Sequence, residues 1–494
     1  MTIMDCDVAI IGCGPVGATL ANLLGKHGVS VTVLEREPGI YHAPRAGHFD
    51  GEIMRVFQAI GLADRISERV RVSIGMRFVN AKGELLLDWP RPQEVGPMGW
   101  HASYRFHQPD LETILRDGMA KLSPIDLKLR CDAFAVDDFD DHVEIRYEDL
   151  NRGTIGRIRA SYVVGCDGAR STVRRFMGTP LDDLLSHENW LIVDGILNRP
   201  RPDLPDHTIQ YCDPARPLTV IRMIDNRRRW EFMLMPGDDP AFMTRPEKVW
   251  KLLERWIGPD EMEIERAVVY TFHSVVASGW LVGRKLLAGD ACHQTPPFMG
   301  QGMCAGIRDA ANLSWKLAAV IRGRAGLSLL DTYETERSPH VREFISTAVR
   351  LGGLIQTRDP EQAAKRDRKL LQNPSIMQTP VPPLGPGLHT GTGAAGRLVP
   401  QFRQADGRRM DDIIGLNFAA LGTRSSRPTI GRELNDRLEQ LGAVRMWDDT
   451  AEIKAYLAEL NTETLVIRPD RYILGSAEDT RAFDALAATM PLAA

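Results

Sequence analysis

The chain has 494 residues, of which 43% are hydrophobic and 26% are charged, and its formal net charge is −4. This composition is typical of a soluble globular protein with enough length for two to four domains. The slightly acidic balance gives no indication of a nucleic-acid groove or a patch for anionic membranes. No apolar stretch reaches 18 residues without glycine, proline or charge, so no membrane span is predicted.

The seven cysteines are scattered and odd in number, and none forms a C-x-x-C pair. This pattern favours buried thiols in a reducing compartment over disulfides or zinc ligands. The first apolar run begins almost at the N-terminus, which leaves no room for a signal peptide. The sequence therefore predicts a cytoplasmic protein without a bound metal ion.

The N-terminal segment predicts a dinucleotide site. An apolar run at 7–11 leads into Gly12-Cys13-Gly14-Pro15-Val16-Gly17, and after a helix a second apolar run ends at Glu35. Gly12 permits a tight turn, Gly14 lets a pyrophosphate approach the backbone, and Gly17 allows close packing of helix on strand. The helix N-terminus favours an anion, and Glu35 can accept hydrogen bonds from the free ribose hydroxyls of FAD or NAD.

The first half of the chain continues with mixed elements. The patterns predict, in chain order, a helix at 51–60, strands between 72 and 89, a helix at 111–122 capped by Asp110, a β-meander at 127–164, and a separate sheet domain from 181 to about 275 that includes a helix at 246–257.

The second half begins with another short apolar strand, which ends at Gly289-Asp290. The patterns then predict a loop at 296–302, helices at 303–322 and 329–351, a linker rich in proline, glycine and charge at 360–393, and a small α/β segment from about 397.

Two later motifs repeat the pattern of a strand that ends in glycine and aspartate, namely Asp167-Gly168 and Gly289-Asp290. In a Rossmann-type sheet, ligands lie at the carboxyl ends of the strands. The set of three motifs resembles the single-component flavoprotein aromatic hydroxylases, and within them the branch of 3-(3-hydroxyphenyl)propionate hydroxylase and phenol hydroxylase. The resemblance covers about 1–350 and includes the spans 44–46, 212–217, 231–237, 287–293 and 308–317.

The resemblance implies an α/β fold with a Rossmann-type FAD-binding domain, an inserted β-sheet substrate domain and a C-terminal thioredoxin-like domain. The implied boundaries are 1–71, 100–180 and 276–358 for the FAD-binding domain, 72–99 and 181–275 for the substrate domain, 359–394 for a linker and 395–494 for the C-terminal domain. The C-terminal domain lacks C-x-x-C, so it would be structural or contribute to a homodimer.

The resemblance also implies FAD as cofactor, NADH or NADPH as co-substrate, O₂, and a small phenolic substrate. The implied reaction is hydroxylation of a phenolic aromatic acid through a flavin hydroperoxide in aromatic catabolism. This electrophile reacts best with a phenolate, so a base near the substrate hydroxyl would help.

By the same resemblance, one set of residues would contact FAD. Asp290 would accept a hydrogen bond from the ribityl chain, and the helix after Gly302 would direct its N-terminus toward the flavin ring. The full set is Gly12, Gly14, Pro15, Val16, Gly17, Glu35, Arg36, Arg45, Gln108, Asp167, Gly289, Asp290, Pro297, Gly300, Gly302 and Met303.

Three residues are candidates for activating the substrate. Asp50 resembles the active-site aspartate of the phenol hydroxylase branch, although it could instead cap the helix that follows. His48 is the alternative base, or else a packing histidine. Tyr211 could hydrogen-bond the phenol, or pack in the core.

Three further residues are candidates for binding the substrate. Arg222 lies mid-strand among apolar residues, and a buried arginine needs an anion, so it could hold a substrate carboxylate or form an edge salt bridge. Pro296 would belong to the wall over the flavin, and Phe298 would line the pocket.

The sequence thus predicts an FAD-dependent, NAD(P)H-consuming monooxygenase of a phenolic acid. One alternative is a flavoprotein that hydroxylates a polycyclic phenol in natural-product biosynthesis. Another is a flavin reductase or oxidase that forms no hydroxylated product. A third is a flavin-free binding scaffold of the same fold, against which Glu35, Arg45, Asp167 and Asp290 argue.

Overall fold

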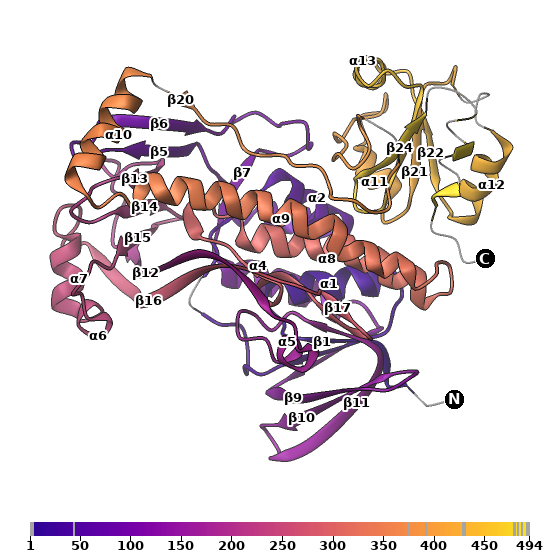
Figure 1. The fold of residues 1–494 in the computed structure, drawn as a ribbon, viewed down its shortest axis with the longest axis horizontal. Helices are drawn as coiled ribbons and strands as arrows, with labels where there is room; N and C mark the ends of the chain where they lie inside the picture. The colour runs from indigo at the N-terminus through magenta and orange to yellow at the C-terminus, as the bar shows by residue number, and fades with distance from the viewer. Residues whose placement is uncertain are drawn as a thin grey trace.

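The computed structural model describes residues 4–42, 45–373, 375–390, 393–426, 431–477, 481, 484–485 and 488–490. Pro44, which belongs to one span of the resemblance, lies outside these residues. Figure 1 shows a body built on two large sheets, with the long helices α8 (Gly302–Ile321) and α9 (Ser328–Ile355) crossing its centre and a small domain at the C-terminal end. Within the described residues, no helix has the length and hydropathy to cross a bilayer.

The first sheet carries the glycine motif. Its strand order is β17-β18-β11-β1-β2-β8, with β10 and β9 added beside β11. The pairs β1–β2, β1–β11 and β11–β18 are parallel, so the carboxyl ends of these strands share one edge. The strands are β1 Cys6–Ile11, β2 Val31–Glu35, β8 Ile125–Leu129, β9 Cys131–Asp138, β10 Val143–Asp149, β11 Thr154–Gly165, β17 Leu281–Val282 and β18 Lys285–Leu287.

Helices pack on the first sheet around one hydrophobic core. The main ones are α1 Pro15–Lys26, α4 Gln108–Ala120, α5 Thr172–Met177 and α8. The prediction that Asp110 caps α4 is wrong, because the helix starts earlier and His107 is its N-cap. Pro109 is tolerated in the first turn, where the backbone N–H would have no intrahelical partner.

The second sheet has the order β19-β16-β12-β15-β14-β13-β5-β6-β20. Its side chains alternate between two faces. Trp190 and Phe298 share the cluster toward α9, whereas Leu191 packs on the outer face toward α7 (Pro246–Leu253). The strands are β5 Gly75–Val79, β6 Leu85–Pro90, β12 Leu181–Leu197, β13 Thr208–Tyr211, β14 Leu218–Arg222, β15 Arg227–Met233, β16 Met262–Ala277, β19 His293–Gln294 and β20 Ser375–Ile376, and the outer face also carries α6 Pro240–Met243.

The predicted linker contains regular structure. Residues 360–372 form α10 (Pro360–Gln372), and β20 pairs with β6 at the sheet edge. Arg366 anchors α10 by donating to the carbonyl oxygens of Leu354 and Cys212, both at 2.8 Å. The segment therefore extends the second sheet. Its charged composition gave no indication of this packing, so the sequence predicted a linker instead.

A small third sheet connects the two large ones. Its order is β3-β7-β4, formed by His48–Asp50, Ser103–Phe106 and Val70–Val72, and β3 leads directly into α2 (Gly51–Ala59), which α3 (Ala63–Ser67) follows. In β3–β7, His48 lies opposite Arg105 and Asp50 lies opposite Ser103. Directly opposite residues place their side chains on the same face, so the third sheet groups polar side chains beside the start of α8.

The C-terminal domain has a four-stranded sheet of order β22-β21-β23-β24. The pair β21–β22 is parallel, and the pairs β21–β23 and β23–β24 are antiparallel. This order fits the predicted thioredoxin-like domain. Its elements are α11 Met410–Ile414, β21 Ala419–Gly422, α12 Arg432–Gln440, β22 Val444–Trp447, α13 Ala451–Glu459, β23 Thr464–Ile467 and β24 Ile473–Ala477.

Candidate active site

The glycine motif forms the centre of the site, at the carboxyl edge of the first sheet. Gly12 has φ +97°, and a Cβ there would lie 2.5 Å from the carbonyl oxygen of Cys166. A Cβ on Gly17 would lie 2.1 Å from the carbonyl oxygen of Gly12. Both positions therefore require glycine for packing within the protein, as the motif predicts.

Gly14 differs from these two glycines because a Cβ there would meet no atom of the described residues within 4 Å. It is the N-cap of α1, Pro15 stands in the first turn, and within the described residues no side-chain cap is found at this helix start. A free helix N-terminus beside open space is a site for an anion. Gly302, at the start of α8, also faces open space.

Glu35 lies at the end of β2 and holds the glycine loop. Its carboxylate accepts hydrogen bonds from the backbone N–H of Cys13 at 2.7 Å and of Glu37 at 2.9 Å. Each carboxylate oxygen can accept a second hydrogen bond, so Glu35 can also receive a ribose hydroxyl. The side chain of Arg36 is 67% exposed and pairs with Glu37, so nothing in the structure ties it to the site.

Gln108 is buried beneath the turn at 45–46. Its Oε1 accepts from the backbone N–H of Arg45 at 2.9 Å and of Ala46 at 2.8 Å, and its Nε2 donates to Glu112 at 2.7 Å. Because both ends of the amide have protein partners, Gln108 positions the Arg45 turn. A direct contact with FAD stays a prediction.

The two later motifs close the site. Asp167 accepts at Oδ2 from the backbone N–H of Thr172 at 2.6 Å, while its buried Oδ1 has no partner in the described part of the chain. Asp290 is exposed on the short 3₁₀ turn η1 (Gly289–Ala291). A buried oxygen without a protein partner calls for a polar ligand or an ordered water. The exposed carboxylate of Asp290 is accessible to the same ligand.

These observations fit FAD. The N-terminus of α1 with Gly14 would hold the pyrophosphate, Glu35 the ribose, and Asp290 the ribityl chain. When bound, FAD supplies the electron transfer and the activation of O₂. Val16 packs between glycines, since a Cβ on Gly289 or Gly306 would meet Val16 Cγ2 at 3.1 or 2.6 Å.

The loop at 296–302 follows β19 of the second sheet and leads into α8, which packs on the first sheet. Pro296 is buried, and Pro297 belongs to a 3₁₀ turn, η2 (Pro297–Met299). Gly300 follows with φ +65°, and α8 begins at Gly302, with Met303 half-buried in its first turn. The loop therefore presents two prolines and a helix N-terminus beside Gly289.

His48 is buried, and both ring nitrogens have protein partners. Nδ1 lies 3.1 Å from the carbonyl oxygen of Gly300, and Nε2 lies 2.9 Å from the hydroxyl of Ser103. Burial and the nearby cations Arg105 and Arg91 lower the pKa of His48 to about 3. A neutral imidazole with both nitrogens engaged is suited to holding the Gly300 loop, and this geometry does not support His48 as the base.

Asp50 caps the helix that follows, which is one of the two roles that the sequence leaves open, while its role toward the substrate stays a prediction. One oxygen caps α2 by accepting from the backbone N–H of Ile53 at 3.2 Å. The other accepts from Arg308 Nη2 at 2.6 Å and from Gln301 Nε2 at 3.2 Å. Burial alone would raise the pKa of Asp50, but Arg308 and the hydrogen bonds outweigh it and hold that pKa below its usual value. Asp50 is therefore a carboxylate at neutral pH.

Two residues that the sequence offers for the substrate take their alternative roles, and a third stays a prediction. Tyr211 belongs to the cluster on the outer face of the second sheet, with Arg255 5.0 Å from its ring centroid. Arg222 is half-exposed and paired with Asp206, so the edge salt bridge is the correct interpretation. Phe298 is buried against Trp190, with ring centroids 5.7 Å apart, and its place in the lining of the pocket stays a prediction. Successive side chains along a strand point to opposite faces of the sheet. A strand residue whose face is assigned wrongly therefore lies on the side away from the site.

The sequence reasoning missed a buried polar face on the second sheet. Arg229 pairs with Asp194 at 2.6 Å and donates to the carbonyl oxygen of Arg45 at 2.9 Å, which joins this face to the glycine site. Thr219 donates to Gln210 at 2.6 Å, and Glu231 lies 3.9 Å from Arg229 on the same face. Strand alternation within the Arg227-Arg228-Arg229 run was the signal that could have indicated it.

The comparisons with known proteins agree with this geometry. The FAD binding domain family matches residues 5–348. A Rhodococcus jostii protein described as a probable NADH-specific resorcinol 4-hydroxylase is 38% identical over 97% of this chain and 94% of its own length. A 3-(3-hydroxy-phenyl)propionate/3-hydroxycinnamic acid hydroxylase of Burkholderia vietnamiensis is 36% identical over 84% of this chain and 79% of its own length.

Solved structures show the same fold. The flavin-dependent monooxygenase PieE, in complex with FAD and substrate, superposes with a TM-score of 0.82 at 21% identity, over 99% of both chains. Aklavinone-11 hydroxylase superposes with a TM-score of 0.81 at 21% identity, over 99% of both chains.

The fold, the glycine motif at the carboxyl edge of the first sheet and these relatives define an FAD-dependent aromatic hydroxylase, a flavin monooxygenase. The chain belongs to the FAD binding domain family, in the branch that contains the phenol-type hydroxylases named above. FAD is therefore its cofactor, and the prediction of a flavoprotein monooxygenase is confirmed, whereas the flavin-free scaffold is excluded.

Proposed function

We propose that this protein hydroxylates a small single-ring phenol that carries an acidic side chain, ortho to the existing hydroxyl, with NADH as the reductant. The Rhodococcus jostii relative supports NADH, and the Burkholderia relative supports the phenolic acid. The observation that carries the proposal is a pair of arginines, Arg91 and Arg105, that lie beside Asp50 and His48.

Arg105 is 9% exposed and lies directly opposite His48 in the β3–β7 pair. Its Nη2 donates to the hydroxyl of Thr208 at 2.5 Å, and Arg91 donates to the hydroxyl of Thr379. In the described part of the chain, neither guanidinium forms an ion pair. Burial lowers the pKa of each arginine to about 10, so both remain cations at neutral pH.

A buried cation without a paired carboxylate favours an anionic ligand. The carboxylate of the substrate would pair with Arg105 and Arg91, and its phenol ring would then lie between Asp50 and the polar face of the second sheet. Asp50 would accept the hydroxyl proton, which makes the ring more electron-rich at the ortho carbon. The buried walls of the site would keep water away from the reacting atoms.

Replacing Asp50 with asparagine tests the proton acceptor. The amide keeps the size of the side chain but cannot take the proton, so kcat is expected to fall by about 100-fold or more, the range typical of lost acid–base catalysis. The measurement is product formation under saturating NADH and substrate. Glu343→Gln, an exposed acid on α9, is the matched control and should retain the wild-type rate. A near-normal rate in Asp50→Asn would contradict the role of Asp50 as the proton acceptor.

Replacing Arg105 with methionine tests the substrate class. The KM for 3-(3-hydroxyphenyl)propionate is expected to rise about 10- to 100-fold, since a charge-assisted hydrogen bond to the carboxylate is lost. Resorcinol carries no carboxylate, so its KM should change little. Arg222→Met is the matched control, because Arg222 pairs with Asp206 on the outer face. Equal effects on both substrates would contradict the proposal.

A second candidate substrate is a neutral dihydroxybenzene, as the name of the Rhodococcus jostii relative suggests. Glu231 favours it, because this buried carboxyl on the inner face could accept a hydrogen bond from a second hydroxyl group. A wild-type enzyme that turns over resorcinol faster than any phenolic acid would establish this alternative.

A further inference from the structure

We infer that Tyr472 of the C-terminal domain and Glu52 of α2 are positioning residues for Asp50, so that the C-terminal domain supports the catalytic centre. The inference rests on the proposed role of Asp50. It assigns the C-terminal domain a part in the reaction in addition to structure or dimer contacts.

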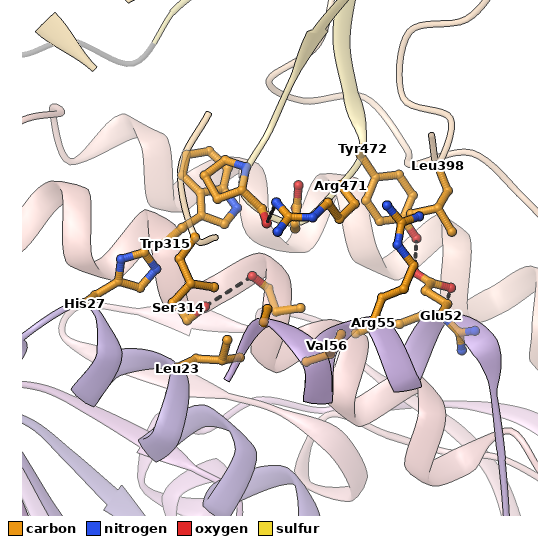
Figure 2. A pocket seen from close by; sticks show the side chains of 16 residues that line it. Leu23, His27, Glu52, Arg55, Val56, Ser314, Trp315, Leu398, Arg471 and Tyr472 are labelled. Atoms are coloured by element: carbon orange, nitrogen blue, oxygen red, sulfur yellow. Dashed lines mark hydrogen bonds and ion pairs between the residues drawn. The ribbon is translucent and has the colours of Figure 1, made fainter. Parts of the chain in front are cut away.

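A continuous line of hydrogen bonds connects the domain to Asp50. The Tyr472 hydroxyl donates to Glu52 Oε1 at 2.9 Å. Glu52 Oε2 accepts from Arg308 Nε at 2.5 Å, and Arg308 Nη2 donates to Asp50 Oδ2 at 2.6 Å. Figure 2 shows the first of these contacts, with Tyr472 reaching from the C-terminal domain toward Glu52.

Arg308 is held on three sides by this arrangement. Besides Glu52 and Asp50, its Nη1 donates to Gln301 Oε1 at 3.0 Å. Gln301 in turn donates to Asp50 Oδ2 at 3.2 Å and immediately precedes Gly302, the first residue of α8. A guanidinium is a rigid planar fork, so fixing Nε fixes the direction of both Nη groups. By fixing Nε, Glu52 determines the orientation in which Arg308 donates to Asp50.

The charges explain why a tyrosine is needed. Two carboxylates, each with a side chain 15% exposed, share the one guanidinium of Arg308, which is 5% exposed. The neutral Tyr472 hydroxyl gives Glu52 a second hydrogen-bond donor without adding charge. Glu52 therefore competes less strongly for the guanidinium of Arg308, which can bind Asp50 more tightly. Burial raises the pKa of Tyr472 well above its usual value, so it stays a donor at neutral pH.

The domain interface keeps Tyr472 in place. Tyr472 is 4% exposed, and its hydroxyl also lies 3.5 Å from His340 Nε2 on α9. Next to it, Asp411 pairs with Arg55 at 2.7 Å and with Arg471 at 3.0 Å. The cavity between the domains measures about 30 Å³, which is too small for an organic ligand. The buried interface therefore fixes the position of the Tyr472 hydroxyl against Glu52.

Tyr472→Phe tests the inference in the FAD-loaded full chain. This change removes only the hydroxyl, so the ring still fills its place. Loss of a hydrogen bond to a charged group is expected to lower kcat for the phenolic substrate about tenfold, with little change in KM. The product formed per NADH consumed should fall as well, and this ratio does not depend on how much protein is folded. Glu52→Gln should show the same pattern more strongly.

Asp412→Ala is the matched control, because Asp412 contacts Gln58 across the same interface without touching the line to Asp50. This variant should keep the wild-type ratio of product to NADH. A crystal structure of FAD-loaded Tyr472→Phe gives a readout that needs no activity, and Arg308 is expected to have turned away from Asp50. An unmoved Arg308, or unchanged kcat and product ratio, would overturn the inference. If the wild type hydroxylates no phenol, the proposed function fails, and the crystal structure alone decides the inference.

Discussion

Gly14→Val is expected to give a folded protein that does not retain FAD. Gly14 has φ −75° and ψ −172°, a conformation that valine adopts readily, and a Cβ there would meet no protein atom within 4 Å. The added side chain would instead occupy the space in which the pyrophosphate must approach the helix N-terminus. Affinity for FAD should fall about 100-fold or more, equivalent to about 2.7 kcal/mol. The measurements are the absorbance ratio of flavin to protein and the unfolding midpoint of the cofactor-free form.

The matched control is Gly353→Val, on an exposed turn of α9 where a Cβ also meets no protein atom within 4 Å. It should bind FAD like the wild type. Gly12→Ala is different, since its Cβ would meet the Cys166 carbonyl, and it should lower the yield of folded protein. A Gly14→Val protein that stays yellow with normal affinity would show that the pyrophosphate lies elsewhere.

Glu336→Gln is expected to detach the C-terminal domain from α9. The Glu336 carboxylate is fully buried and accepts from Arg468 at 2.7 and 2.8 Å, from Lys316 at 2.7 Å and from Asn312 at 2.8 Å. The amide leaves two cations buried without this charge, which should cost about 3–5 kcal/mol of unfolding free energy. The loss should be measured by denaturant unfolding, with Glu343→Gln on the same helix as the control.

This ion network also predicts a pH dependence. Although burial opposes it, Arg468 and Lys316 hold the pKa of Glu336 far below the ordinary value of 4.5. The folded state therefore binds this proton less readily than the unfolded state, so the stabilisation is fully present above that ordinary value and is lost as the pH falls below it. The difference in stability between wild type and Glu336→Gln should narrow as the pH is lowered from 6 toward 3.5. A difference that stays constant would contradict the role of charge at this position.

The motifs predicted the first sheet well, for a physical reason. Gly17 packs on the carbonyl oxygen of Gly12, and Glu35 accepts from Cys13 N–H, so these two contacts lie within one strand–helix–strand unit. Gly12 packs on Cys166 at the end of the neighbouring strand β11, but its positive φ is a local requirement of the turn. The same holds for Asp50, whose cap to Ile53 is local. Steric and hydrogen-bond requirements of this local kind can be predicted from a single sequence.

The errors concern contacts that depend on the whole fold. A substrate contact by Tyr211 or Arg222 would require the inner face of the second sheet, but the strand register places both side chains on the outer face. Arg366 holds α10 through carbonyl oxygens of Leu354 and Cys212, and a polar, charged segment gives no sign of such partners. The line from Tyr472 to Asp50 joins residues 422 positions apart in the chain, and only the packed domains bring them together.

The most direct test of the central claim is turnover of the purified protein with NADH and 3-(3-hydroxyphenyl)propionate under ¹⁸O₂. The account predicts that the phenol stimulates NADH oxidation and that mass spectrometry finds one ¹⁸O atom in the product, ortho to the original hydroxyl. A product that carries oxygen from water, or NADH oxidation that yields only peroxide with every phenol in the panel, would contradict it.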